Sequence, residues 1–447
     1  MSLHNTTTEC NFKVIVIGAG IAGLAAAHHL ERAKRQGNAP KGLQVVVYEQ
    51  REGNPITDKY PAQLSEDARQ CLTNIIAPAS YSDLVDLSDY GISHGGVNIL
   101  NNDLTHLFSN KKYENEQPQW INRKVLSSLL SDGVNVLRGR RVVRVRDLKD
   151  NKVEVVLDNG TTELADFVIG ADGMNSTIRS QLHPAFSKTP QLPFILVQFK
   201  LATPFPQIPK AFQRDCVNLV LGNSSNSTQI ILFSGSQLPL MDPKTAIKLS
   251  EEGPFAEPND EVKAVQQALE DPKCGFVLVR MMIPTRLTQD WEDLTDGSWI
   301  DKILTFLRED GTNLELIKMI ENDLVPATIQ ASPIFSSEIG KAVPFKEGRI
   351  VLIGDAMHVV PPTNGNSIAA ALKDAQDIAE TLLASSELGG ADGPLQTLLP
   401  QNHYALKTRS EDYLKKSLHL LEVSNQTGIQ GFLHRGMLRS MNWLKSF

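Results

Sequence analysis

Three closely spaced glycines near the start of the chain constrain its fold more than any other feature. The segment GAGIAG (18–23) follows a β-branched run, KVIVI (13–17), and leads into small residues that predict a helix over 24–36. After a polar break comes a second apolar run, QVVVY (44–48). Strand, glycine-rich turn, helix and strand in this order predict one βαβ unit with parallel strands and a right-handed crossover.

Each glycine of this segment has its own expected task. Gly18 permits a tight turn, Gly20 lets the backbone approach a pyrophosphate, and Gly23 lets the helix pack on the strand. The helix N-terminus adds N–H donors and a partial positive charge. Glu49 ends the second strand, where a carboxylate accepts hydrogen bonds from ribose hydroxyls and disfavours a 2′-phosphate. The unit therefore predicts a site for FAD or NAD rather than NADP, and it leaves FAD and NAD undecided.

Two later segments repeat the pattern of a strand end followed by a loop and a helix. The sequence FVIGADGMNSTIR (167–179) places Asp172 and Gly173 at a strand end, with a serine and an arginine along the following turn. The sequence GDAMHVVPPTNG (354–365) follows another parallel-type strand, RIVLI (349–353).

In this order and at this spacing, the three segments resemble the group A flavoprotein monooxygenases, the aromatic-hydroxylase-like class. There they are the dinucleotide fingerprint, the DG motif and the GD motif. Residues 122–130 (NRKVLSSLL) also resemble the family's Arg-x-x-Leu segment, whose arginine contacts the flavin nucleotide. The resemblance covers most of the chain and implies FAD as the cofactor. It also implies NADPH or NADH as a transient co-substrate, since no second GxGxxG follows a later strand.

The resemblance further implies roles for single residues. Glu49 would hold the adenosine ribose, Arg123 would lie against the phosphate–ribityl side of the cofactor, and Asp355 would bond the ribityl chain. Asp172 and Gly173 would border the groove for NAD(P)H and help to fix the pyrophosphate region.

The last implied contacts surround the flavin ring. Pro361 and Pro362 would lie beside it, and the helix beginning within 365–369 would point its N-terminus at flavin N1 and the C2 carbonyl. Here Ser367 and Ala369 replace the family's usual glycine and asparagine, and KYPA (59–62) replaces a stretch that is often glycine-rich. The implied cofactor-binding set is Gly18, Gly20, Gly23, Glu49, Arg123, Asp172, Gly173, Asp355, Pro362, Gly365 and Ile368.

For function, the resemblance implies insertion of one oxygen atom from O2 into an apolar, electron-rich small molecule by way of a C4a-hydroperoxyflavin. The substrate would be an aromatic, polyketide, alkaloid or terpenoid of secondary metabolism, and the reaction hydroxylation or epoxidation. Because the cofactor carries this chemistry, no catalytic residue is assigned. Arg280 and Tyr60 are candidates for the substrate site, although a strand-end arginine is more often structural, and His358 is expected to fix its loop. A flavin-dependent reductase or oxidase on the same scaffold and a non-catalytic flavin-binding sensor stay open as alternatives.

The pattern changes between the motifs. Residues 141–169 alternate apolar and polar side chains around turn signals, which predicts an antiparallel meander. Further strand-like runs stand at 194–199, 217–221, 229–233 and 276–283, and helices are expected over 369–384 and from 395 onward.

We therefore expect an α/β fold in which a Rossmann-like FAD-binding domain is split in sequence around a β-sheet substrate domain, with a helical C-terminal segment. The expected boundaries are 1–75, 123–180 and 340–390 for the FAD-binding domain, 76–122 and 181–339 for the substrate domain, and 391–447 for the C-terminal segment.

Composition limits the partners. Among the 447 residues, Lys and Arg number 44 against 51 Asp and Glu, a net charge of −7 without a long basic run. This argues against nucleic acid and against an anionic membrane surface. The four cysteines lack metal or CxxC spacing, which favours unpaired thiols in a reducing compartment. We expect a cytoplasmic protein, with no metal, whose partners are a small-molecule substrate and O2, and the sequence leaves its oligomeric state open.

Overall fold

The computed structural model divides into two compact units. Unit 1 comprises residues 1–84, 122–190 and 336–417, and unit 2 comprises 85–121, 191–335 and 418–447, so the expected C-terminal segment is shared between them. The structure describes residues 12–53, 61–86, 97–110, 119–148, 150–201, 203, 208–212, 216–222, 229–234, 277–288, 299–324, 329–363, 365–387, 392–424, 426 and 428–444.

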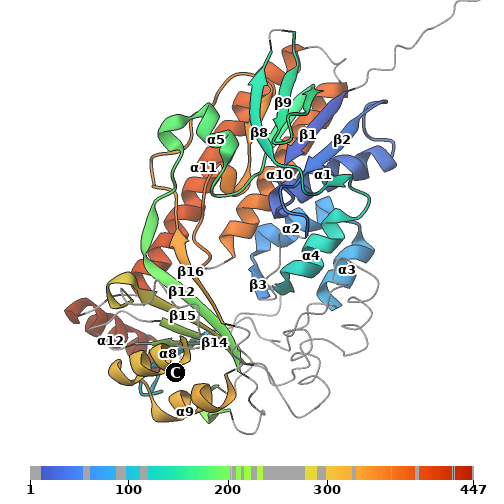
Figure 1. Ribbon diagram of the computed structural model, residues 1–447. Helices are drawn as coiled ribbons and strands as arrows, with labels where there is room; N and C mark the ends of the chain where they lie inside the picture. Colours follow the sequence, from blue (N-terminus) through green and yellow to red (C-terminus); the bar gives the residue numbers. More distant parts are fainter. Residues whose placement is uncertain are drawn as a thin grey trace, which may run out of the picture. The chain divides into compact units, whose positions relative to one another are not determined.

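Unit 1 is an α/β unit (Figure 1). Its elements are β1 (Lys13–Ile17), α1 (Ile21–Arg35), β2 (Gln44–Tyr48), β3 (Pro61–Leu64), α2 (Glu66–Ile75), α3 (Pro78–Asp86, which continues into unit 2), α4 (Arg123–Ser131), β7 (Val136–Leu137), β8 (Val142–Asp147), β9 (Val153–Leu157), β10 (Thr162–Ala165), β11 (Phe167–Gly170), α5 (Thr177–Leu182), η2 (Pro184–Phe186), β17 (Ile350–Leu352), η8 (Gly354–Ala356), α10 (Asn366–Glu387) and α11 (Asp392–Ser424, which also continues into unit 2).

A five-stranded parallel sheet organises this unit, in the order β17-β11-β1-β2-β7. Val14, Ile15 and Val16 are fully buried, because a parallel sheet has both faces covered. Helix α1 contacts both α10 and α4. The predicted strands at 13–17 and 44–48 are confirmed, while the first helix begins at Ile21 rather than Leu24.

The predicted meander was wrong at its end. Strands β8, β9 and β10 do form an antiparallel sheet of three strands. Residues 167–170, however, form β11, which pairs in parallel with β1 and β17. Every residue of β11 is buried, whereas the strands before it alternate, and an unbroken apolar run is typical of a parallel strand.

Unit 2 is built on a seven-stranded sheet in the order β16-β12-β15-β14-β13-β4-β5. Neighbours pair antiparallel except β13 and β4, which are parallel. The elements are β4 (Val97–Asn101), β5 (His106–Asn110), β6 (Gln119–Asn122), β12 (Gln191–Leu201), η4 (Lys210–Phe212), β13 (Cys216–Leu221), β14 (Gln229–Ser234), β15 (Val277–Pro284), η5 (Thr285–Leu287), α8 (Trp299–Glu309), α9 (Leu314–Asp323), β16 (Gln330–Phe335) and α12 (Gly428–Leu444).

The core of unit 2 joins one face of this sheet to two helices. Phe199 of β12 and Val279 of β15 belong to the same buried cluster as Leu307 of α8 and Ile320 of α9. The four strand-like runs predicted between 194 and 283 are confirmed as β12 to β15. Helices α8 and α9 were not predicted.

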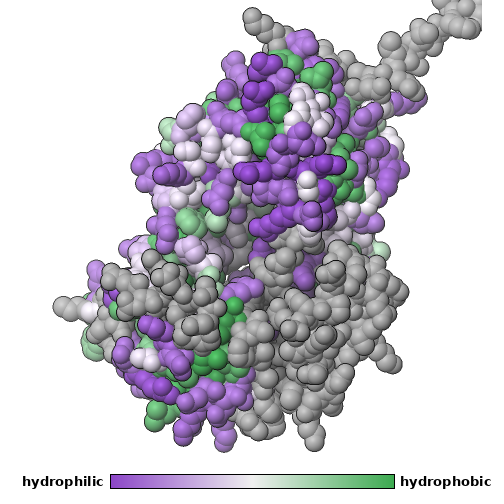
Figure 2. All heavy atoms as spheres, viewed as in Figure 1, coloured by the Kyte–Doolittle hydropathy of each residue, from purple (hydrophilic) through white to green (hydrophobic). Residues whose placement is uncertain are grey.

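Three further findings concern the described part of the chain. No helix in it is both long and apolar enough to cross a bilayer. Within the same residues, no group of three or more His, Cys, Asp or Glu could hold a metal ion. Cys71 is buried and unpaired. On the face of unit 1 seen in Figure 2, most of the coloured residues are hydrophilic.

Candidate functional site

The loop between β1 and α1 leaves no space for side chains at two of its three glycines. Gly18 has φ +103°, and a Cβ there would lie 2.4 Å from the carbonyl oxygen of Ala171. A Cβ at Gly23 would lie 2.0 Å from the carbonyl oxygen of Gly18. Gly20 differs, since its φ is −73° and an added Cβ would meet no protein atom within 4 Å. Neither the backbone nor a neighbour requires glycine there, which fits close approach by a ligand.

The N-terminus of α1 is arranged to attract an anion. Gly20 is its N-cap residue and supplies no side-chain hydrogen bond, and the first turn contains no acidic residue. The unsatisfied N–H groups of a helix start, together with the helix dipole, favour a phosphate at this position.

Glu49 lies beside this loop with its carboxylate fixed from both sides. It is 5% exposed, and its Oε2 accepts a hydrogen bond from the Ala19 N–H at 2.9 Å. Its Oε1 accepts from the Arg51 N–H, also at 2.9 Å. Because a carboxylate offers about four acceptor positions, these bonds leave capacity for ribose hydroxyls.

Asp172 organises the turn that follows β11. Its Oδ2 accepts hydrogen bonds from the N–H groups of Thr177 at 2.7 Å and Ile178 at 3.2 Å, and the Ser176 hydroxyl donates to its Oδ1 at 2.5 Å. Burial raises the pKa of this carboxyl, and the same hydrogen bonds oppose that rise. Gly173 follows with φ +80° and open space at its Cβ position. Asp172 thus holds the start of α5, and its expected contact with NAD(P)H stays a prediction.

Arg179 connects the second and third motifs. Its side chain is buried, and Nη1 donates to the carbonyl oxygens of Asp355 at 3.1 Å and Ala356 at 3.0 Å. Its Nη2 donates to the carbonyl oxygen of Met174, and its Nε to that of Phe186 at 2.8 Å. Burial lowers the pKa of the guanidinium, while Asp172 and Asp355 oppose that change. The sequence placed this arginine within the second motif but assigned it no role.

Asp355 lies in η8, shortly after the end of β17, and its carboxylate is exposed. Within the part of the chain that the structure describes, this carboxylate makes no hydrogen bond, although the backbone of Asp355 is held by Arg179. The surrounding protein raises the pKa of this carboxyl by desolvation. The charges of His358, Arg123 and Arg179 oppose this rise but do not cancel it. Arg123 begins α4, so the structure brings two of the predicted cofactor residues into electrostatic contact.

A buried ion-pair network lies behind the GD motif. His358 is 5% exposed, and its Nε2 lies 2.7 Å from Oδ2 of Asp374, which agrees with the expected loop-fixing role. The same Oδ2 accepts from the Gly354 N–H at 3.0 Å, and Oδ1 accepts from Nη2 of Arg409 at 2.8 Å. Burial raises the pKa of Asp374, but His358 and Arg409 outweigh it and the net pKa is lowered. Sequence reasoning missed both Asp374 and Arg409.

The start of α10 requires its glycine. Gly365 has φ +77°, and a Cβ there would lie 2.3 Å from the carbonyl oxygen of Gln63 in β3. The helix begins at Asn366, with no acidic residue in its first turn. Pro362 is exposed just before the helix, while Ile368 is buried within it. The carbonyl oxygen of Gly365 accepts from the N–H of Ala369, so the unusual alanine continues the helix.

The two candidates for the substrate site have different outcomes. Tyr60 lies outside the described residues, as does Lys59. Arg280 belongs to unit 2, where it is paired with Gln198 and Ile231 in the middle of β15. The interpretation of Arg280 as a strand-end residue was therefore wrong, and its contact with substrate stays a prediction.

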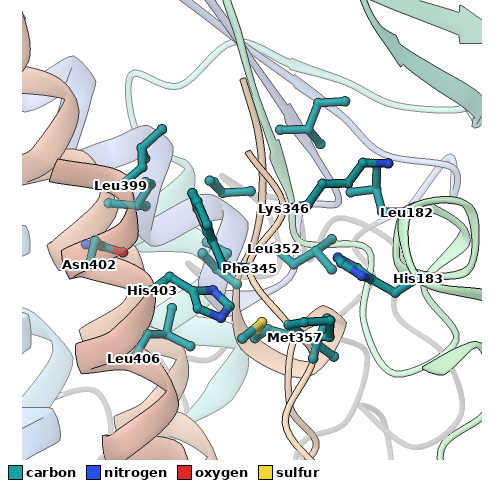
Figure 3. A pocket seen from close by; sticks show the side chains of 16 residues that line it. Leu182, His183, Phe345, Lys346, Leu352, Met357, Leu399, Asn402, His403 and Leu406 are labelled. Carbon is teal, nitrogen blue, oxygen red and sulfur yellow. The ribbon is translucent and has the colours of Figure 1, made fainter. Parts of the chain in front are cut away.

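Unit 1 also contains a small cavity that none of the predicted cofactor residues line. It has a volume of about 30 Å³ and lies between β17 and α11. Figure 3 shows the rings of His183 and His403 beside it, together with Met357 and Phe345. Burial lowers the pKa of both histidines. A space of this size holds about one water molecule, so it does not fit an organic substrate.

Comparison with known proteins gives these features a family. A family model described as an FAD binding domain matches residues 245–397, which include the GD motif. A second model, FAD dependent oxidoreductase, matches residues 13–57, which include the glycine loop and Glu49. The FAD-dependent monooxygenase ltmM of Epichloe festucae (strain Fl1) is 24% identical over 440 residues, 94% of this chain and 80% of that protein. These matches support the resemblance of the chain to the group A flavin monooxygenases.

Two further proteins are similar to this chain at comparable levels of sequence identity. The p-hydroxybenzoate hydroxylase of Acinetobacter baylyi is 22% identical over 397 residues, 85% of this chain and 79% of that protein. The solved structure of Klebsiella pneumoniae HpxO complexed with FAD and uric acid is 18% identical, with a TM-score of 0.68 over 98% of this chain and 95% of that one. The second similarity confirms the fold.

The residues of unit 1 fit the cofactor of the group A flavin monooxygenases. The open position at Gly20, the uncapped N-terminus of α1 and the fixed carboxylate of Glu49 suit an adenosine diphosphate. The exposed Asp355 carboxylate, with no hydrogen bond to described residues, suits a polyol. This protein is therefore an FAD-dependent oxidoreductase.

Proposed function

We propose that this protein uses NADPH or NADH to insert one oxygen atom from O2 into an apolar, electron-rich small molecule, by hydroxylation or epoxidation. The observation that carries the proposal is the Asp355 carboxylate, exposed shortly after the end of a parallel strand while Arg179 holds its backbone. The p-hydroxybenzoate hydroxylase relative acts on an aromatic compound, as its name says, which supports this substrate class.

Four groups of unit 1 would hold the cofactor. The N–H groups after Gly20 would bind the pyrophosphate, and Glu49 would accept hydrogen bonds from the adenosine ribose. Arg123 and Asp355 would bind the ribityl phosphate side, where their opposite charges match a chain of hydroxyls that ends in a phosphate. When bound, FAD supplies hydride acceptance and oxygen activation.

Helix α10 would stabilise negative charge on the flavin ring. Its 22 residues start after Gly365, and a helix N-terminus stabilises a nearby anion by roughly 0.3–2 kcal/mol. The first turn of the helix contains no acidic residue that would offset the partial positive charge of its N-terminus. Pro362, exposed next to this N-terminus, would contact the ring.

The nicotinamide cofactor would bind transiently on unit 1. Gly173 has open space at its Cβ position, which would allow a flat ring to approach the backbone. Asp172 would keep that turn in shape through its bonds to the start of α5.

Replacing Asp355 by asparagine should weaken FAD binding by about tenfold to a hundredfold, because a charge-assisted hydrogen bond contributes about 1.5–3 kcal/mol. The apoprotein should not be destabilised, since the carboxylate makes no hydrogen bond to described residues and its raised pKa means that its charge costs stability in the folded state. Titration of the apoprotein with FAD, followed by flavin fluorescence, measures the affinity. The matched control is Glu338→Gln, whose carboxylate is half exposed on a surface ion pair of the same unit. An unchanged affinity in the Asp355 variant would remove this residue from the cofactor site.

The function itself is tested without oxygen. NADPH is added anaerobically to the FAD-loaded protein, and loss of the oxidised-flavin absorbance is followed with and without a panel of aromatic and polyketide compounds. One compound should accelerate reduction and, once air is admitted, yield a product heavier by one oxygen atom. Fast reduction with no compound, followed by peroxide formation, would favour the reductase or oxidase. A protein that neither NADPH nor NADH reduces with any compound would favour the sensor.

A further inference from the structure

We infer that helix α12 binds the surface of an anionic lipid bilayer. This helix (Gly428–Leu444, red in Figure 1) belongs to unit 2. Lipid binding by the helix would be a property separate from the function proposed above, because it depends on no substrate. The inference rests on the exposed side chains of the helix and on its charge.

One face of α12 holds it to the protein. Leu438 is buried in a cluster with Leu107, Phe108 and Leu221. Nη2 of Arg435 donates a hydrogen bond to the carbonyl oxygen of Gly222 at 2.6 Å. These contacts fix which side of the helix faces away from unit 2.

Large apolar side chains are exposed elsewhere on the helix. Phe432 is 74% exposed, Leu433 63%, Met437 53% and Met441 41%. Leu433, Met437 and Met441 are spaced four residues apart, so they form one stripe along the helix, with Phe432 next to its start. Single exposed apolar residues are ordinary, but several on one helix face mark a surface that binds a partner.

The charge of the helix selects the partner. Arg439 is exposed, Lys445 follows the helix in the sequence, and residues 428–447 contain no Asp or Glu, in a chain whose net charge is −7. A symmetric contact with a second copy would bring these positive groups together, which is unfavourable. A helix with exposed Phe and Leu and only basic charged residues has the composition of helices that lie in the interface of anionic membranes. The net charge of the whole chain, which predicted no membrane contact, does not reflect this local excess.

The test is cosedimentation of the full-length holoenzyme with vesicles of phosphatidylcholine alone or mixed with phosphatidylserine. Binding to the mixed vesicles should be at least about tenfold stronger and should weaken at high salt. The double variant Phe432→Ser/Met437→Ser should lose at least about tenfold in binding, and Arg439→Gln about fivefold. All three side chains are exposed, so the melting temperature should not change.

The control is Leu314→Ser, which removes a 69% exposed leucine from α9 of the same unit and should bind as the unchanged protein does. Absence of vesicle binding would overturn the inference, as would equal binding by the double variant. Sedimentation equilibrium provides the second decision. A dimer that dissociates in the double variant would assign this face to a second copy of the chain and overturn the lipid assignment.

Discussion

Replacing Gly20 by alanine is expected to leave the protein folded and to weaken FAD binding by about a hundredfold. An added Cβ at this position meets no protein atom within 4 Å, and φ is −73°, which alanine adopts without strain. The cost to the apoprotein should stay within about 1 kcal/mol, the difference between glycine and alanine at a helix N-cap. A loss of affinity would therefore come from the ligand, whose pyrophosphate the methyl group would displace from the N–H groups of α1.

Two further glycines make this result specific. Gly18→Ala should impair both folding and binding, because its φ is +103° and its Cβ would lie 2.4 Å from the carbonyl oxygen of Ala171. Gly53→Ala is the matched control, since its Cβ also meets nothing and it lies outside the glycine loop. Affinity is measured by titrating each apoprotein with FAD, and stability by urea unfolding. If Gly20→Ala binds FAD as tightly as Gly53→Ala does, the pyrophosphate does not lie against Gly20.

The parts of the site that the sequence predicted are those with a local cause. A side chain at Gly23 would clash with the backbone of Gly18, and a side chain at Gly18 would clash with the backbone of Ala171 at the end of β11. The spacing of the glycines in the sequence motif reflects these two contacts. Strands β1 and β2 were predicted correctly because their apolar runs are also local features of the sequence. The end of the meander was mispredicted because FVIG continues a run of strand-forming residues, and its different partner is set by tertiary contacts with β1 and β17.

The residues that hold the motifs together had no local signal. Arg179 donates to carbonyl oxygens 176 and 177 residues further along the chain. Asp374 stands in a helix whose sequence, KDAQDIAE, is equally typical of a solvated face, and its arginine partner is 35 residues away. A charged side chain on a helix is usually exposed, so only the packing of α10 against η8 reveals that this one is buried.

Replacing Asp374 by alanine is expected to destabilise the protein by about 3–5 kcal/mol, because removal of one partner leaves buried charge uncompensated. Asp374 is 0% exposed and accepts from Arg409 at 2.8 Å and from the Gly354 N–H at 3.0 Å, with His358 at 2.7 Å. The measurement is urea unfolding of the apoprotein at neutral pH. Asp412→Ala is the control, since Asp412 and Lys416 are 55% and 60% exposed and such pairs contribute about 0–1 kcal/mol. Equal effects of the two substitutions would contradict the assigned role of the buried network.

The contribution of the Asp374 carboxylate to stability should also depend on pH. His358 and Arg409 lower the pKa of Asp374 below its ordinary value of 3.8, in spite of the burial that raises it. A carboxyl whose pKa is lower in the folded state than in the unfolded state stabilises the fold at pH values above 3.8, and this contribution is lost as the pH falls below that value. Asp374→Asn has no carboxylate to protonate, so the stability gap between it and the unchanged protein should narrow as the pH falls through this range. If the difference in free energy of unfolding stays constant with pH, the asparagine variant is destabilised by something other than the loss of charge. The lowered pKa of Asp374 then does not contribute to stability. A narrowing gap would show that the pairing of Asp374 with His358 and Arg409 makes the stability of the fold sensitive to acid.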